Sequence, residues 1–472
     1  MKDKIEKIHA LALRILSEIG LRLHHPEIVE MVCQNGIRME GDTVFFKPDQ
    51  VMDWVKKAPE SFTIHARNPM HDVVIGGDRI ACAPGYGCAT IYDATGGTRE
   101  ALLSDYIELS KLVHQCPHFQ VNGGILAQPS DVPADKSHLI MLSAAITHSD
   151  KCLMGIPGNA AHIQDVMEMA AILFGGNASL MEKPRILTMI STISPLQIDE
   201  MALSSILASA RYRQPLIISP APAAGTTGPI DLAANIALAT AEALAAIAVA
   251  QMIQPGLPVI FGLQCYGADL RTGNISIGSP AYSLQAKYCA ALARMYKIPS
   301  RGGGTTNDAK AVSPQSGYES MLSMLTAWQN RVNLIVHSAG ILDSFSGISY
   351  EQFIMDMELI DMIRYYEDDL EVSDNTLNFD LIREVGPGGQ FLTSPDTLQK
   401  CRTHTWNPEI SLRGSIGNAD PHEMFLANIA RKRQKMVSGY KKPELAENIS
   451  ARLYDFLAAR GISGEILNQI FT

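Results

Sequence analysis

Polar and aromatic side chains that could bind or transform a ligand follow three short apolar runs of the chain. They lie in the segments Gln264–Asp269, Arg301–Glu319 and His337–Phe353. In α/β enzymes, active sites are built where a buried strand ends in a conformationally permissive loop. We therefore expect these three segments to lie on one rim of the fold and to carry the site.

The chemistry of these residues leaves several interpretations open. Gly302-Gly-Gly304 could cradle an anion with its backbone N–H groups, but it lacks the Gly-Lys-Ser/Thr ending of a phosphate-binding loop. Lys310 could form the Schiff base of an aldolase-type barrel, but such a lysine is expected within an apolar strand, and Lys310 lies in a polar loop. Asp308, Lys310 and Glu319 are therefore interpreted as residues that structure the loop. His337 fits a structural role and a ligand contact equally well.

Nucleophilic and metal chemistry find little support. The sequence shows no Ser-His-Asp order and no nucleophile-elbow motif. The eight cysteines are scattered without a Cys-x-x-Cys pair, so we expect reduced and mostly buried thiols. The nearest candidate for a zinc site is His114-x-Cys116-x-His118, which is expected at a helix end. We predict no metal site.

The elements that must position these residues alternate from about residue 100 onward. Helical stretches such as Ser137–His148 and Leu232–Ile253 are separated by short apolar runs, at a spacing of roughly 30 to 45 residues, which is the βα unit of a (β/α)8 TIM barrel with insertions. Seven runs are expected as strands: Phe119–Gly123, Cys152–Ile156, Arg185–Ile190, Pro215–Ser219, Pro258–Gly262, Ile298–Gly302 and Leu334–His337. The eighth could come from the first region of the chain or from the segment after Tyr366. A doubly wound sheet is the alternative, but no Gly-x-Gly-x-x-Gly opens the first βα unit.

The chain is expected to have three parts. Residues 1–98 should form an N-terminal α+β extension, residues 99–410 the barrel, and residues 411–472 a helical extension with two amphipathic helices between Pro421 and Phe471. The basic run Arg431–Lys435 fits a solvated helix face, with docking to an acidic partner as the alternative.

Bulk properties exclude some functions. A net charge of -10 and a pI near 5.7 give no basic surface for nucleic acid. The stretch Leu232–Ile253 is long enough to span a membrane, but Glu242 lies near its middle and alanine adds little lipid affinity, so we expect a core helix. The N-terminus runs straight into an amphipathic helix without a signal peptide, and the protein is expected in the cytoplasm.

Motifs along almost the whole chain resemble those of the trimethylamine methyltransferase superfamily. They are Asp93-Ala-Thr-Gly96 with Arg99; Arg301, Gly304, Asp308-Ala-Lys310, Gln315, Gly317 and Glu319; Asn333-Leu-Ile335, His337, Ala339-Gly340, Leu342, Ser344, Ser349-Tyr350-Glu351, Phe353 and Asp356; and Val385–Leu392 with Thr403-His404-Thr405. Each motif alone is loose, and their order and spacing together are fairly specific.

The resemblance implies a TIM-barrel enzyme that moves a methyl group from an amine to the cobalt of a separate corrinoid (cobalamin-type) protein. Founding members carry pyrrolysine in a loop where this chain is expected to hold Leu342, an inert side chain. Members without pyrrolysine include demethylases of glycine betaine, proline betaine and carnitine, so the resemblance implies a quaternary-amine substrate in anaerobic one-carbon metabolism. It implies no permanently bound cofactor, and a homo-oligomer is expected.

The chemistry of a quaternary amine agrees with the lack of a nucleophile. Its methyl group is already activated because the leaving group is a neutral tertiary amine, so the protein need only align the substrate and exclude water. A cation without N–H donors is held by aromatic faces. The expected substrate-binding residues are Tyr86, Gln264, Tyr266, Arg301, His337, Phe345 and Tyr350. A betaine carboxylate would be bound by Arg301, by His337 or by the backbone amides of Gly303 and Gly304. The alternatives are the aldolase-type enzyme that uses Lys310 and a quaternary-amine binding protein without catalysis.

Overall fold

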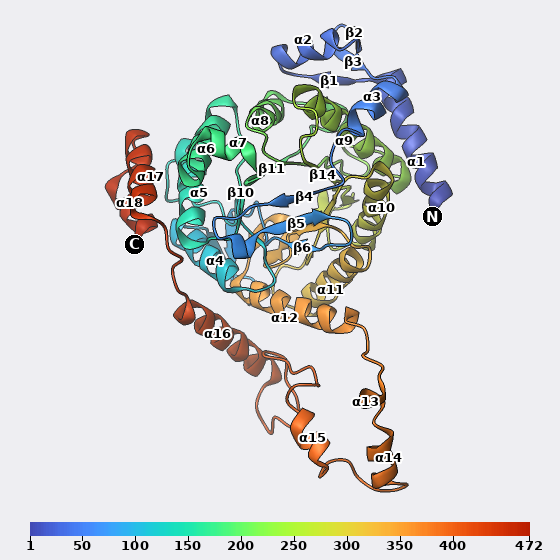
Figure 1. Cartoon of the computed structure of the whole chain (residues 1–472), viewed down its shortest axis with the longest axis vertical. Helices are drawn as coiled ribbons and strands as arrows, with labels where there is room; N and C mark the ends of the chain where they lie inside the picture. The colour runs from blue at the N-terminus through green and yellow to red at the C-terminus, as the bar shows by residue number, and fades with distance from the viewer.

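The apolar runs form one closed parallel barrel in the computed structural model, which describes residues 1–472 (Figure 1). Its strands are β6 (Ala81–Cys82), β9 (Val121–Gly123), β10 (Cys152–Met154), β11 (Ile186–Ile190), β13 (Leu216–Ile218), β14 (Val259–Gly262), β17 (Ser300–Gly303) and β18 (Leu334–Val336). They neighbour one another in chain order, β18 pairs with β6, and a parallel bridge between Cys82 and Phe119 closes the ring. The TIM-barrel prediction is confirmed.

The eighth strand, β6, comes from the first region of the chain and not from the segment after Tyr366. The boundary expected at residue 98 is therefore wrong, because the barrel already begins at Ala81. At the other end, the last barrel helix ends at Glu367, well before residue 410.

The barrel strands are buried on both faces, which explains their continuous apolar runs. Along β13 and β14, Ile217 and Ile260 belong to one apolar core cluster, whereas their neighbours Leu216, Ile218 and Phe261 belong to the other. The outer layer consists of α4 (Leu103–Gln115), α5 (Ser137–His148), α6 (Ala160–Phe174), α7 (Asn177–Glu182), α8 (Glu200–Arg211), α9 (Leu232–Ile253), α10 (Pro280–Tyr296), α11 (Pro314–Gln329) and α12 (Tyr350–Glu367).

Helix α9 has the length and hydropathy of a membrane span, yet 94 % of that window is buried within the protein. Its Glu242 is fully buried and accepts hydrogen bonds from Thr192, Ser194 and the backbone N–H of Leu196. The carboxylate therefore holds the loop after β11, and α9 is the core helix that the sequence predicts.

The N-terminal segment packs on the outside of the barrel. It contains α1 (Lys2–Arg14), a π-helical turn (Ile15–Ile19), β1 (Leu21–Leu23), α2 (Pro26–Gln34), β2 (Arg38–Glu40), β3 (Thr43–Phe45) and α3 (Pro48–Val55). Helices α1 and α3 pack against α9, and β1 pairs in parallel with β12 (Gln197–Ile198).

Two small sheets build the rim at the carboxyl ends of the strands. One joins the hairpin of β7 (Thr90–Tyr92) and β8 (Thr98–Glu100) to the hairpin of β19 (Ile341–Leu342) and β20 (Gly347–Ile348). The other pairs β15 (Gly267–Asp269) with β16 (Asn274–Ser276). Both therefore carry loops that the sequence assigns to the site.

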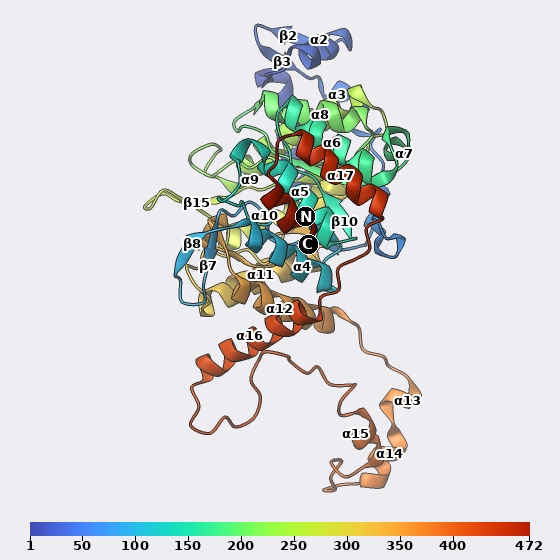
Figure 2. The ribbon, with the colours of Figure 1, turned by 90° about the vertical axis from the view of Figure 1, so that its left-hand side faces the viewer.

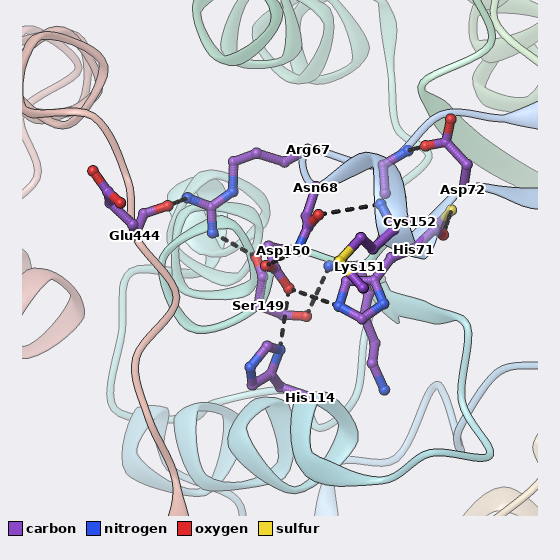
Figure 3. Close-up of polar contacts among 12 residues, drawn as sticks. Arg67, Asn68, His71, Asp72, His114, Ser149, Asp150, Lys151, Cys152 and Glu444 are labelled. Carbon is purple, nitrogen blue, oxygen red and sulfur yellow. Dashed lines mark hydrogen bonds and ion pairs between the residues drawn. The ribbon is translucent and has the colours of Figure 1, made fainter.

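The opposite end of the barrel is closed by the hairpin of β4 (Ser61–Ile64) and β5 (Val73–Gly76) and by a polar cluster beside it (Figure 3). Arg67 donates to the carbonyls of Ile146 and Ser149 at the end of α5 and to the carbonyl of Glu444 in the C-terminal tail. Lys151 donates to the carbonyls of Val113 and Cys116 at the end of α4. These bonds satisfy helix C-termini and fix the tail to the barrel, so we assign the cluster a structural role.

The C-terminal region has three helices where two were expected: α16 (Pro421–Gly439), α17 (Glu447–Ala459) and α18 (Gly464–Phe471). They pack against α12 and α4, against α6, and against α5, respectively. Between α12 and α16, residues 368–400 extend away from the barrel and carry α13 (Asp374–Leu377), α14 (Phe379–Val385) and α15 (Pro395–Lys400) (Figures 1 and 2). The chain then returns to the barrel, where Glu358 of α12 accepts from the backbone N–H groups of Glu409, Ile410 and Ser411.

Candidate active site

A cavity of about 240 Å³ lies at the carboxyl ends of the barrel strands. Its lining is mostly aromatic, aliphatic and thioether, with few polar groups, which is typical of small-molecule sites. It is lined by Tyr86, Gly87, Gly124, Ile125, Met154, Gly155, Pro157, Met189, Gln264, Tyr266, His337 and Phe345. The structure thus brings together five of the seven expected substrate-binding residues: Tyr86, Gln264, Tyr266, His337 and Phe345.

Arg301 lies beneath this cavity, inside the barrel. Its side chain starts on β17 and crosses over Gly262 of the neighbouring strand; a Cβ at Gly262 would lie 2.9 Å from the Arg301 Cδ. One terminal nitrogen donates to Ser219 Oγ at 3.3 Å, while Nε has no partner in the chain. The guanidinium is fully buried without a carboxylate partner, and burial lowers its pKa.

Gln264 connects the guanidinium to the cavity. With its amide oriented to satisfy both neighbours, Oε1 accepts from the two terminal nitrogens of Arg301 at 2.5 Å each, and Nε2 donates to the Tyr266 hydroxyl at 2.9 Å. A buried cation bonded to neutral groups alone is energetically unfavourable. The floor of the cavity therefore favours an anion.

His337 is a neutral hydrogen-bond donor on the cavity wall. Burial, and then the positive charge of Arg301, hold its pKa well below the ordinary value. Its Nδ1 accepts from the backbone N–H of Tyr86 at 3.3 Å, so the ring proton belongs on Nε2. The left-handed backbone of His337, with φ of 60°, is a conformation that non-glycine residues rarely adopt and that clusters at functional sites.

Aromatic rings surround the upper part of the cavity. The Phe345 ring lies 4.6 Å from the His337 ring and 6.1 Å from the Tyr266 ring, centroid to centroid. Tyr86 lies 6.1 Å from His337, and its buried hydroxyl has no hydrogen-bond partner. These faces can hold an alkylammonium cation, and the free hydroxyl is a further donor for a ligand.

Phe345 is presented by a strained turn. Asp343, Ser344 and Phe345 all have positive φ, between 50° and 74°, and such residues cost of order 1–2 kcal/mol each. Asp308 holds the turn by accepting from Ser344 Oγ at 2.7 Å and from the backbone N–H of Ile277 at 2.8 Å.

Glu319 and Lys310 support the same turn from either side. Glu319 accepts from the backbone N–H of Asp308 at 2.7 Å, and Lys310 forms an ion pair with Asp343. Tyr92 donates to the other oxygen of Asp343 at 2.8 Å. The loop-structuring roles expected of Asp308, Lys310 and Glu319 agree with these contacts, and Lys310 is 66 % exposed, away from the cavity.

The prediction that Tyr350 belongs to the aromatic cage is wrong. Its hydroxyl donates to Asp105 at 2.9 Å, and the Arg433 guanidinium covers its ring at 3.6 Å. Because it begins α12, its side chain turns away from the barrel axis and lines a separate cavity of about 380 Å³ outside the barrel. Leu342 is fully buried in β19 and contributes nothing to the cavity lining, so its assignment to the pyrrolysine slot stays a prediction.

Several residues of the site were missed from the sequence. Met154 and Met189 line the cavity, Tyr282 lies stacked 6.1 Å from Tyr266, and Ser219 contacts Arg301. Ser219 stands at the end of an apolar run and Met154 lies within one, which was the available signal. No group of three or more His, Cys, Asp or Glu side chains is placed to hold a metal ion.

The family model described as "Trimethylamine methyltransferase (MTTB)" matches residues 1–464. The chain is 40 % identical over 461 residues to glycine betaine methyltransferase of Desulfitobacterium hafniense strain Y51, covering 98 % of this chain and 96 % of the relative. It is 26 % identical over 462 residues to proline betaine:corrinoid methyltransferase of Eubacterium limosum, covering 94 % and 93 %. Among solved structures, the Methanosarcina barkeri monomethylamine methyltransferase has a TM-score of 0.56 at 12 % identity, covering 93 % of this chain and 88 % of that one, and shares the fold.

Proposed function

This chain belongs to the trimethylamine methyltransferase family, and on that premise we propose that it demethylates a betaine and delivers the methyl group to a separate corrinoid protein. It is an enzyme of methyl transfer from quaternary amines to a corrinoid. The finer proposal, a substrate that carries both a quaternary ammonium and a carboxylate, depends on one observation. That observation is the buried Arg301 without a carboxylate partner below an aromatic cavity.

The two ends of the cavity suit the two ends of a betaine. The carboxylate would be directed toward the floor, where Gln264 and Arg301 lie and where His337 and Tyr86 offer further N–H and O–H donors. The ammonium would then lie among Tyr86, Tyr266 and Phe345, nearer the mouth. Because the charge of Arg301 repels a ligand that is only cationic, the same residue would select zwitterions over simple amines.

The size of the cavity fits this assignment. A volume of about 240 Å³ suits a small amine, and it is below the roughly 300–1,000 Å³ of sites that enclose drug-sized ligands. A corrin ring has no room inside, so the corrinoid must reach the substrate from the mouth. When docked, it supplies a cobalt nucleophile for the methyl group.

The residues of this chain then have three tasks. They bind the carboxylate, point one N–CH3 bond toward the mouth, and exclude water through the rings of Tyr266 and Phe345. No general acid is required because the tertiary amine leaves as a neutral molecule. The absence of a nucleophile–base pair in the cavity agrees with this chemistry.

We propose glycine betaine as the first substrate to test, since the 40 % identical relative carries that name. Lys310 does not support the aldolase-type alternative, because it is exposed and paired with Asp343. We further propose a cytoplasmic location and a homo-oligomer. The location is supported by eight free cysteines, six of them buried.

The deciding experiment measures methyl transfer from each of four amines to a reduced Co(I) corrinoid, followed by the change in its visible spectrum. The amines are glycine betaine, choline, dimethylglycine and trimethylamine, and we expect transfer from glycine betaine alone. Equal activity on choline would overturn the role of the carboxylate, and activity on trimethylamine alone would overturn the quaternary-amine assignment. Calorimetric binding of glycine betaine without transfer to any corrinoid would support the binding-protein alternative.

A further inference from the structure

Residues 368–400, here called the arm, expose apolar side chains that nothing in the chain covers. None of α13, α14 and α15 contains a buried residue, and none packs extensively against another helix or strand. Eight large apolar side chains of the arm are between 44 % and 83 % exposed: Leu370, Val372, Leu377, Phe379, Ile382, Phe391, Leu392 and Leu398. Figures 1 and 2 show the arm standing clear of the barrel in both views.

Such a segment requires a partner for physical reasons. Helices of four to seven residues are not stable by themselves, and monomeric proteins rarely expose apolar patches larger than a few hundred Å². The exposed side chains of the arm offer an area on the order of the roughly 800 Å² that each partner buries in a stable interface.

We propose that the arm of one copy occupies a groove on a second copy of this chain. The groove lies between α1, α9 and α10 and has a volume of about 430 Å³. It is lined by Lys4, Lys7, Ile8, Leu232, Ala233, Ile236, Leu284 and Tyr288. Its floor is apolar, and the charged groups on its wall are both lysines.

Charge complementarity matches the arm to this groove. Between residues 368 and 385 the arm carries the carboxylates of Asp368, Asp369, Glu371, Asp374, Asp380 and Glu384 against the single basic residue Arg383. In the groove, Lys4 forms no ion pair within the chain, and Lys7 pairs with the exposed Asp3 at 2.9 Å. An acidic segment with apolar side chains therefore meets a basic groove with an apolar floor.

The position of the arm argues against the corrinoid protein as its occupant. Helix α12 runs antiparallel to the barrel strands, so the arm leaves from the end opposite the cavity. In Figure 2 the rim strands β7, β8 and β15 lie on the left, whereas α13 and α14 lie on the right. A corrinoid protein that docks over the mouth of the cavity would therefore lie at the opposite end of the barrel from the arm. Interfaces with a transient partner are also more polar than the apolar surface that the arm presents.

A second copy also permits a reciprocal exchange. In Figure 1 both α1 and the arm lie to the right of the barrel axis, α1 beside the upper part of the barrel and the arm below it. Two copies related by a two-fold axis on that side can therefore each insert an arm into the groove of the other, which doubles the contact in one closed assembly.

Charge reversal tests the pairing by the mass of the full-length protein in analytical ultracentrifugation. We expect the wild type to be an oligomer at micromolar concentration. Lys4→Glu/Lys7→Glu and Asp369→Lys/Glu371→Lys/Asp374→Lys/Glu384→Lys should each weaken association by about tenfold or more, because the second variant gives residues 368–385 more basic than acidic side chains. Mixing these two variants in equal amounts should restore it to within about threefold of wild type, because each arm then faces a groove of opposite charge.

Matched controls separate this result from misfolding. Met70→Asp changes an apolar side chain that is 89 % exposed outside the arm and groove, and it should leave the mass unchanged. Phe379→Asp should give a monomer with wild-type circular dichroism. A monomeric wild type, or two charge variants that remain dissociated when mixed, would overturn the proposal. Loss of corrinoid-protein binding in Phe379→Asp with an unchanged mass would assign the arm to that partner instead.

Discussion

Gln264 accepts hydrogen bonds from both terminal nitrogens of Arg301, at 2.5 Å each, in the interior of the barrel. The amide is thus the main neutral partner of a fully buried cation, and it also forms part of the cavity wall. A ligand carboxylate that approaches Gln264 would find the positive charge directly behind it. Under the proposed function, this pair would select the substrate by its charge.

Removing the charge of Arg301 should therefore change which amine binds. Arg301→Met keeps the volume of the side chain and leaves no carboxylate unpaired, so the variant should fold. We expect the Kd of glycine betaine, measured by calorimetry, to rise about 100-fold, and that of choline to fall. Arg331→Met, which alters an exposed arginine, is the control. Equal losses for both ligands would argue against selection by charge.

Truncating Phe345 should weaken binding of the ammonium group. A cation–π contact contributes about 0.5–2 kcal/mol, so Phe345→Ala should raise the KM for a betaine by roughly twofold to thirtyfold. Tyr350→Phe is the matched aromatic control because Tyr350 lies outside the cavity. A larger effect of the Tyr350 variant on KM would show that the cage has been assigned to the wrong ring.

Asp308 should act on the substrate only through the turn that carries Phe345. Asp308→Ala removes the acceptor for Ser344 and for the backbone N–H of Ile277, which should lower stability by about 2 kcal/mol and raise KM. Faster amide hydrogen exchange at residues 343–345 would report the released turn. Lys310→Met should alter KM and stability little, since exposed ion pairs contribute about 0–1 kcal/mol. Unchanged exchange in the Asp308 variant would separate the carboxylate from the turn.

Acid should destabilise the contact between the barrel and its C-terminal tail. Burial, followed by the charges of Lys111 and Lys442, lowers the pKa of His148 to about 4 from the ordinary 6.5. The unfolded chain therefore binds a proton in a pH range where the folded chain does not, so the free energy of unfolding is full above pH 6.5 and falls by on the order of 3 kcal/mol as the pH drops toward 4. In urea titrations, His148→Gln should show a shallower decline over this window, and His422→Gln, which alters an exposed histidine, should match wild type. Identical slopes for all three proteins would contradict the assignment.

The barrel and most of its site could be predicted from the sequence because both depend on local patterns. Apolar runs at βα spacing define seven strands, and the residues that directly follow such runs must lie on one rim. That rule was sufficient to bring Gln264, Tyr266 and His337 together. It could not find β6, because a two-residue strand has no periodicity to detect.

Other features were decided only by the tertiary structure. Phe345 and Tyr350 lie five residues apart in one loop, yet a left-handed turn directs the first into the cavity and the start of α12 directs the second outward. Two further features cannot be read from the sequence: Arg301 is buried without a carboxylate partner, and the apolar side chains of the arm are uncovered. Both depend on which groups are absent from the surroundings of a residue in the folded chain. The sequence determined which residues stand at strand ends, and the packing of the whole chain decided which of them face a ligand.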